Sequence, residues 1–289
     1  MKFGTPIPLC PSNPVTFDNP ARLCHPVTML VFDLCSGTGS ATVAFKEAGH
    51  TVVTIDIERI SDTLTERIDL MFVTPDYLLE KYGAPDFVWM SPPCTYFSLG
   101  NISANWDTFA LCRRLHCGGV VRPGGGKYQP YWHCSDPKCE RRIPPDACDK
   151  QYIPKSRQAK ESIALVNHLV HLAYNLEHTA NYYRRDMYWV MENPVGMMRH
   201  LNITSKLQRQ TVTYCQYGAN RQKPTDLFGR LPKDFVAMSC RRGDDCHVPT
   251  GRGSKVGTQG MNAVTAGRIP YGLSLAMLEA VTYAQRESA

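Results

Sequence analysis

The chain has 289 residues, 43% of them hydrophobic, which is enough to bury the core of one large domain or of one domain with an appendage. It contains no run of about 18 apolar residues, and residues 1–20 are polar and rich in proline, so we expect a soluble, cytoplasmic protein with no membrane partner. The twelve cysteines are then thiols, metal ligands or a nucleophile rather than a disulfide framework. The net charge of +6 favours a polyanionic partner.

The first predicted elements form a nucleotide-binding pattern. An apolar strand over 29–33 is followed by a Ser-Gly-Thr-Gly turn, a helix over 40–48, and a second strand over 51–56 that ends in an acid. Glycines let the backbone approach an adenosine group, and the acid accepts hydrogen bonds from its ribose hydroxyls. The turn has no third glycine at the dinucleotide spacing, which disfavours a nicotinamide enzyme.

Later elements continue the alternation of strands and helices. A third strand over 87–90 ends at Ser91-Pro92-Pro93-Cys94, and a fourth over 187–191 runs into Glu192-Asn193-Pro194. The pattern also predicts a helix from about Arg157, a fifth strand over 212–214 and a C-terminal helix over 274–285. This order predicts a doubly wound, mostly parallel, Rossmann-like α/β fold, in which ligands bind at the carboxyl ends of the strands.

Two stretches lack this periodicity and are predicted to be irregular, namely 101–156 and 225–267. The first is basic and rich in glycine, and it contains five candidate metal ligands: Cys112, Cys117, Cys134, Cys139 and Cys148. Four thiolates bind zinc tetrahedrally and can order a segment that has little apolar content.

The sequence allows more than one set of four zinc ligands in this stretch. One consists of the two Cys-x4-Cys pairs, and another replaces Cys112 by Cys148 and leaves Cys112 in a helix. His116 and His133 are further candidates, and thiols without a metal are the simplest alternative. A separate group contains Cys240, Cys246 and His247, but three such residues in a loop more often bind nothing.

Three segments resemble, in their order, the motifs of DNA cytosine-C5 methyltransferases. Residues 33–39 resemble the cofactor loop, residues 91–98 the nucleophile loop, and residues 191–194 the glutamate motif. Residues 214–226 and the endings 257–260 and 268–274 are similar to the compact enzymes of bacteriophages and prophages. The matches extend from about residue 28 to residue 285, and the two irregular stretches are the parts least shared.

The resemblance implies covalent catalysis. Carbon C5 of cytosine is a poor nucleophile, so Cys94 would add to C6 of a cytosine that is flipped out of the stack. Glu192 would hydrogen-bond N3 and the exocyclic amine, and C5 would then take the methyl group of S-adenosylmethionine. Enzymes that methylate an exocyclic amine usually have an aromatic residue where this chain has Cys94.

The resemblance also assigns binding residues. The cofactor positions are Asp33, Cys35, Ser36, Gly37, Thr38, Gly39, Asp56, Ile57, Asp69, Leu70 and Pro92. Cys35 replaces an aromatic residue that stacks on adenine in the wider family. The family's Gln-x-Arg-x-Arg motif is here Arg221, Lys223 and Thr225. Lys223 would take the role of the first arginine and Arg221 would compensate for Thr225, although a phosphate contact or a surface charge explains either residue equally well.

The chain is expected to have a catalytic domain, an insertion and a target-recognition region. Residues 1–100, 157–224 and 268–289 would form the catalytic domain, 101–156 a cysteine-rich insertion, and 225–267 a short target-recognition region. We expect a monomer that methylates double-stranded DNA at a short motif in a bacterial or phage-infected cell, either to protect it from restriction or as a step toward further modification. The alternatives are an enzyme that methylates transfer RNA and a catalytically silent DNA-binding protein.

Overall fold

The computed structural model describes most of the chain. The described residues are 28–112, 117, 120–123, 132–136, 139, 142–143, 148–241, 243–248 and 261–287. The backbone alone is described for 108–112, 120–123, 132–133, 142–143, 148–151 and 263. The motif over 257–260 and the residue His116 therefore lie outside the described part.

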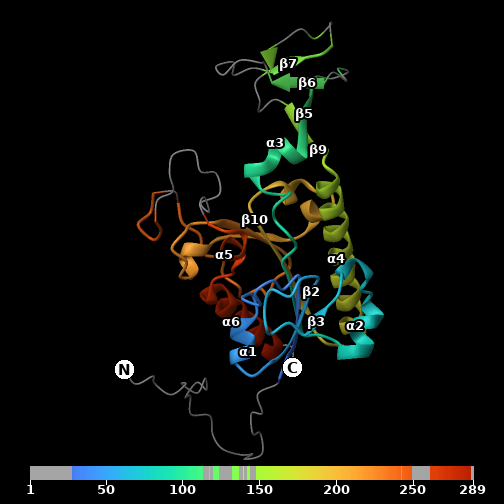
Figure 1. The fold of residues 1–289 in the computed structure, drawn as a ribbon, viewed down its shortest axis with the longest axis vertical. Helices are drawn as coiled ribbons and strands as arrows, with labels where there is room; N and C mark the ends of the chain where they lie inside the picture. Colours follow the sequence, from blue (N-terminus) through green and yellow to red (C-terminus); the bar gives the residue numbers. More distant parts are fainter. Residues whose placement is uncertain are drawn as a thin grey trace, which may run out of the picture.

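A seven-stranded sheet forms the centre of the molecule (Figure 1). Its strands, in spatial order, are β11 (Arg209–Thr213), β12 (Pro224–Arg230), β10 (Tyr188–Pro194), β4 (Phe87–Met90), β1 (Leu30–Leu34), β2 (Thr51–Asp56) and β3 (Glu66–Arg67). The five strands from β10 to β3 run parallel, whereas β12 is antiparallel to both β10 and β11. The predicted Rossmann-like, mostly parallel α/β fold is confirmed.

Helices bury both faces of this sheet, because its central strands are apolar on both sides. Phe32, Val88 and Met90 belong to one core cluster with residues of α4 (Arg157–Tyr182). The alternate residues Val31, Phe87 and Trp89 belong to a second cluster with α1 (Val43–Glu47) and α6 (Tyr271–Glu287). Figure 1 shows α4 on one side of the sheet and α1 with α6 on the other.

The stretch 101–156 is more regular than predicted. After a short helix α3 (Ile102–Asn105), it contains five antiparallel strands in the order β8-β7-β6-β5-β9. These are β5 (Trp106–Cys112), β6 (Val120–Pro123), β7 (Trp132–Cys134), β8 (Arg142–Ile143) and β9 (Cys148–Pro154). The expectation of irregular structure was wrong here, as was the option that Cys112 lies in a helix, because all of β5, Cys112 included, pairs with β9 in an antiparallel ladder.

The prediction also failed at two other places. Helix α2 (Pro75–Tyr82) was missed because it is a single short element, begun by a Thr74 cap and ended at Gly83. The predicted loop from residue 225 is wrong for its first six residues, which belong to β12 and are buried or half-buried in the sheet. Asp226 and Gly229 interrupt the apolar pattern of β12. No helix of the described residues is both long and apolar enough to cross a membrane.

Candidate functional site

The nucleophile loop leaves the sheet at the carboxyl end of β4. The Ser91 amide donates to the Leu34 carbonyl (3.0 Å), and the Trp89 indole donates to the Ser91 hydroxyl (2.9 Å). The Cys94 carbonyl then accepts the amides of Phe97 and Ser98, both at 3.0 Å, in a tight turn. This turn fixes the backbone that presents the half-buried Cys94 thiol.

Glu192 reaches the same edge because β10 pairs directly with β4. Met191 is in register with Met90, so Glu192 follows one position beyond the last paired residue. Asn193 ties the two segments together, because its buried amide nitrogen donates to the Pro92 carbonyl at 3.0 Å. Glu192 itself is only 5% exposed. The structure thus brings two residues that are almost one hundred positions apart to neighbouring strand ends.

Lys223 and Tyr214 complete the surroundings of Glu192. The Tyr214 hydroxyl donates to Oε1 of Glu192 at 2.8 Å. The Lys223 Nζ lies 4.0 Å from the same oxygen, 4.3 Å from the centre of the Tyr214 ring, and 2.8 Å from the Ala266 carbonyl oxygen to which it donates. Lys223 is buried, so its charge acts with little screening by water.

The two other members of the altered basic motif, Thr225 and Arg221, make no hydrogen bond or ion pair with Glu192. Thr225 is completely buried, and its hydroxyl donates to the Lys223 carbonyl at 3.1 Å. Arg221 is half-buried and makes no hydrogen bond or ion pair with the described residues. Its compensating role stays a prediction. Tyr214 was not singled out from the sequence, and the only available signal was its aromatic ring within the matching segment 214–226.

Burial dominates the electrostatics of this group. Desolvation raises the pKa of the Cys94 thiol, the charge of Glu192 raises it further, and Lys223 opposes both effects. Burial also raises the pKa of Glu192, against the charge of Lys223 and the hydrogen bond from Tyr214. Glu192 therefore retains a proton more readily than an exposed carboxyl does, and it can donate a hydrogen bond to a ring nitrogen.

A cavity of about 360 Å³ lies beside the nucleophile loop. Six of the predicted cofactor residues line it, namely Cys35, Gly37, Asp56, Ile57, Asp69 and Leu70. Five further lining residues were not predicted: Glu58, Ile60, Ser91, Pro93 and Leu165. Most of these come from the ends of β1, β2 and β4, which is where a parallel sheet binds nucleotides.

The remaining predicted cofactor residues do not line the cavity, and most of them make hydrogen bonds near the glycine loop. Asp33 is fully buried and accepts the Thr42 hydroxyl at 2.8 Å, and burial raises its pKa to about 7. Thr38 donates to the Ser40 hydroxyl, and the Ser36 amide donates to the Ile55 carbonyl. Gly39 has a left-handed backbone conformation (φ 69°), and the buried Pro92 binds Asn193 through its carbonyl. Their contact with a cofactor stays a prediction.

The residues that line the cavity have the chemistry that S-adenosylmethionine requires. Asp56 and Asp69 provide carboxylate acceptors for hydroxyl and amino groups, and Ile57, Leu70 and Leu165 provide apolar surface for a purine. A Cβ added at Gly37 would meet no atom within 4 Å, so a ligand can approach this backbone directly. The Gly37 amide is held by Asp56 at 2.8 Å, which orders the loop before a ligand binds.

Two groups of candidate metal ligands are present among the described residues. In the insertion, the sulfurs of Cys117, Cys134 and Cys139 lie within 4.8 Å of one another. The side chains of Cys112, Cys148 and His133 lie outside the described part, so the choice of a fourth ligand stays open. In the second group, Cys215 joins Cys240, Cys246 and His247. The sequence had suggested only the last three.

Comparisons with known proteins add little to this geometry. No known family profile and no curated protein sequence matches the chain. Among solved structures, the crystal structure of the Dnmt2 methyltransferase from S. pombe is similar, with 15% sequence identity and a TM-score of 0.36. The similarity covers 70% of this chain and 51% of that chain, so this chain spans about half the length of that protein. At this level the similarity does not identify a substrate or an activity.

Proposed function

We propose that the protein methylates carbon C5 of cytosine in DNA, with S-adenosylmethionine as methyl donor and Cys94 as nucleophile. One observation carries the proposal: the loop that presents Cys94 also lines the adjacent nucleotide-sized cavity through Ser91 and Pro93. A methyl group held in this cavity would lie next to a base held at Cys94. Glu192 and Lys223, on neighbouring elements, supply the charges that such a base requires.

The residues would divide the reaction as follows. The Cys94 sulfur adds to C6 of the cytosine, and Glu192 donates a hydrogen bond at N3 that offsets the negative charge entering the ring. Lys223 stabilises the Cys94 thiolate and any charge on the cytosine carbonyl oxygen. S-adenosylmethionine, when bound, supplies an electrophilic methyl group for C5. Water then takes the proton from C5, and the sulfur leaves C6 as a thiolate, which restores the aromatic ring and the enzyme.

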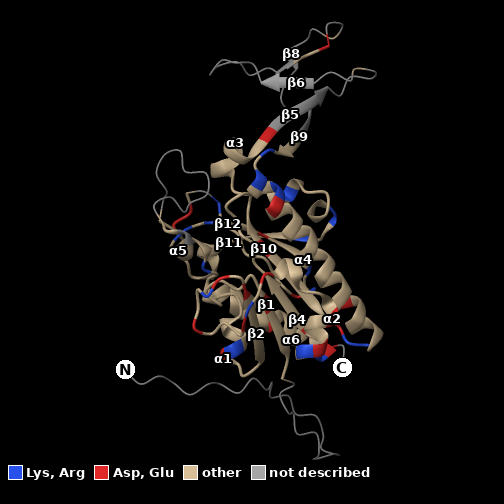
Figure 2. Ribbon diagram, turned by 45° about the vertical axis from the view of Figure 1, so that its right-hand side comes forward, with Lys and Arg blue, Asp and Glu red and all other residues tan. Residues whose placement is uncertain are grey.

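A nucleic acid as the substrate, for which we propose DNA, is supported by positive charge near the insertion. The segment after Cys94 leads through α3 into β5, and β9 returns to α4, so the insertion leaves the domain close to the catalytic edge. Figure 2 shows basic residues at the start of α4. Lys155 and Arg157 have side chains that are 40% and 87% exposed. Their ion pairs with Asp107 and Glu161 lie at the surface and are weak, so phosphates can replace them.

The proposal is tested by trapping the covalent adduct. A duplex that contains 5-fluorocytosine, incubated with S-adenosylmethionine, should stay bonded to Cys94, because fluorine does not leave as a proton does. Mass spectrometry should find the nucleotide on the Cys94 peptide, and Cys94→Ser should prevent it. An adduct with transfer RNA that contains 5-fluorocytosine, and none with the duplex DNA, would show that the substrate is RNA. The absence of an adduct with both nucleic acids would overturn the catalytic proposal.

A further inference from the structure

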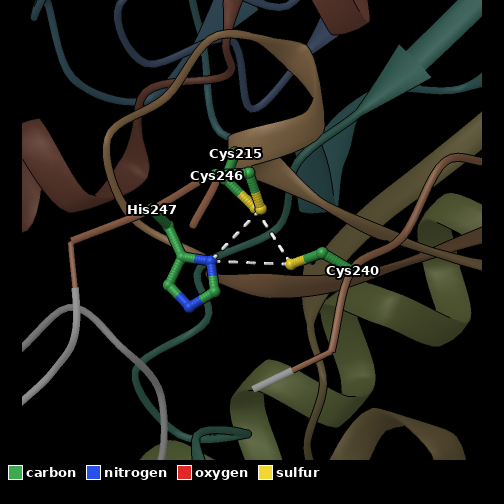
Figure 3. A group of neighbouring side chains, drawn as sticks. All are labelled: Cys215, Cys240, Cys246 and His247. Atoms are coloured by element: carbon green, nitrogen blue, oxygen red, sulfur yellow. Dashed lines mark hydrogen bonds between the residues drawn. The ribbon is translucent and has the colours of Figure 1, made fainter. Parts of the chain in front are cut away.

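We propose that Cys215, Cys240, Cys246 and His247 form a structural zinc site, separate from the cysteine-rich insertion and from the catalytic cavity (Figure 3). The ligands come from three places in the chain. Cys215 lies in the short helix η6 (Tyr214–Tyr217), Cys240 lies in the loop after β12, and Cys246 and His247 are adjacent residues further along that loop. Figure 3 shows the three sulfurs and the ring nitrogen Nδ1 directed toward one another.

The separations are close to those around a tetrahedral ion. Cys215 Sγ lies 3.2 Å from Cys240 Sγ and 3.6 Å from Cys246 Sγ. His247 Nδ1 lies 3.7 Å from Cys240 Sγ and 3.4 Å from Cys246 Sγ. Zn–S bonds of about 2.3 Å and Zn–N bonds of about 2.0 Å place tetrahedral ligands about 3.8 Å apart for two sulfurs and about 3.5 Å for sulfur and nitrogen. The two sulfur–sulfur separations are therefore shorter than in a zinc site, and the two sulfur–nitrogen separations lie on either side of the expected value.

The ligand types indicate the metal and its role. Three thiolates and one imidazole suit zinc, whereas magnesium and calcium prefer oxygen ligands. All four positions of the tetrahedron are taken by protein side chains, which is typical of a structural rather than a catalytic site. The metal would also neutralise thiolate charge that three neighbouring cysteines could not otherwise hold together.

Neighbouring groups already orient the ligands. The Gln222 side-chain amide donates to the Cys240 sulfur (3.4 Å) and to its carbonyl oxygen (3.3 Å). The Cys240 amide donates to the Thr213 hydroxyl at 2.9 Å. Partners of this kind commonly surround metal ligands and hold them in position.

The site would fasten the loop after β12 to the elements that flank Glu192. Cys215 directly follows Tyr214, which binds Glu192, and Gln222 directly precedes Lys223. Two backbone hydrogen bonds connect the same segments. The Thr213 amide donates to the Met238 carbonyl (3.1 Å), and the Val248 amide donates to the Asn220 carbonyl (2.9 Å). Cys246 is exposed, and the apolar side chains of Met238 and Val248 are 42% and 50% exposed, so a metal would supply cohesion that packing does not.

The test measures metal content per protein chain. Protein purified from zinc-supplemented cells and passed through a desalting column should contain at least one zinc by mass spectrometry of the metal. His247→Ala and Cys240→Ser should each lower the content by one equivalent, whereas His178→Ala, at an exposed histidine of α4, should leave it unchanged. Cys134→Ser removes a ligand from the group in the insertion. Its zinc content therefore shows whether the insertion binds a second zinc, independently of the site proposed here.

Two further measurements keep the outcome clear if a variant folds poorly. Cobalt bound to the wild-type protein should give the visible absorption of a tetrahedral thiolate site, and His247→Cys should retain the metal while strengthening the sulfur-to-cobalt bands. Chelation should open the loop over 238–248 to proteolysis. Equal zinc content in the wild-type protein, His247→Ala and Cys240→Ser, or the absence of zinc from the wild-type protein, would overturn the proposal.

Discussion

Tyr214 donates a hydrogen bond of 2.8 Å to Oε1 of Glu192, and both side chains are buried. This bond lowers the pKa of a carboxyl whose burial raises it, so Tyr214 helps to set the protonation state of Glu192. The same ring lies 4.3 Å from the ammonium group of Lys223. One aromatic side chain thus connects the two residues whose charges act on the Cys94 thiol.

Tyr214→Phe should keep this ring and remove only the hydroxyl. The pKa of Glu192 should then rise, and the limb of the pH–rate profile that reports Glu192 should move to higher pH. Because protonated Glu192 is the form that donates to N3, Tyr214→Phe should retain kcat/KM to higher pH than the wild-type protein does. Tyr283→Phe, at a half-exposed tyrosine of α6, is the control. An unchanged profile in Tyr214→Phe would remove Tyr214 from this role.

Lys223→Met should make the Cys94 thiol less reactive. Lys223 lowers the pKa of both Cys94 and Glu192, so its loss should raise both values and reduce the thiolate fraction at neutral pH. The rate of Cys94 alkylation by iodoacetamide, followed against pH by intact mass, should shift to higher pH. Lys223→Arg, which keeps the charge, should stay near the wild-type curve. Coincident curves for Lys223→Met and the wild-type protein would show that Lys223 does not influence the thiol.

Gly196→Ala should disturb the nucleophile loop, although Gly196 lies about one hundred positions later in the sequence. A Cβ at this position would lie 2.2 Å from the carbonyl oxygen of Phe97, in the turn that follows Cys94. The backbone must move, and overpacking of this kind costs about 1–3 kcal/mol of the free energy of unfolding. We expect a lower melting temperature and a fall in kcat that is larger than the change in cofactor affinity. Gly267→Ala, where a Cβ meets nothing within 4 Å, should change neither.

Asp56→Asn should weaken cofactor binding. One carboxylate oxygen of Asp56 holds the Gly37 amide at 2.8 Å, and the other accepts the Glu58 amide at 2.9 Å. The neutral amide is a weaker acceptor for these groups and for ribose hydroxyls, so the Kd for S-adenosylmethionine should rise by about 10-fold in titration calorimetry. Asp62→Asn, at an exposed acid of the nearby loop, should bind like the wild-type protein. Equal affinity in Asp56→Asn would place the cofactor elsewhere.

Short-range patterns were sufficient for much of the fold. The apolar runs over 51–56 and 87–90 and the helix start at Arg157 agree with β2, β4 and α4. Strands buried on both faces and capped helices carry their signals within a few neighbouring residues. Strand β12 was missed because its burial depends on two distant partners, β10 and β11, and its own sequence has no continuous apolar run.

The sequence by itself determined the types and order of the chemical groups: a glycine loop, an acid at the end of β2, Cys94 and Glu192. Only the tertiary structure decided which groups meet. It placed Tyr214 and Lys223 against Glu192, and it added Cys215 to three candidate metal ligands that lie 25 or more positions later. Local propensity sets where a strand ends, but the pairing of β10 with β4 and β12 and the packing of the loop after β12 set the distances between side chains.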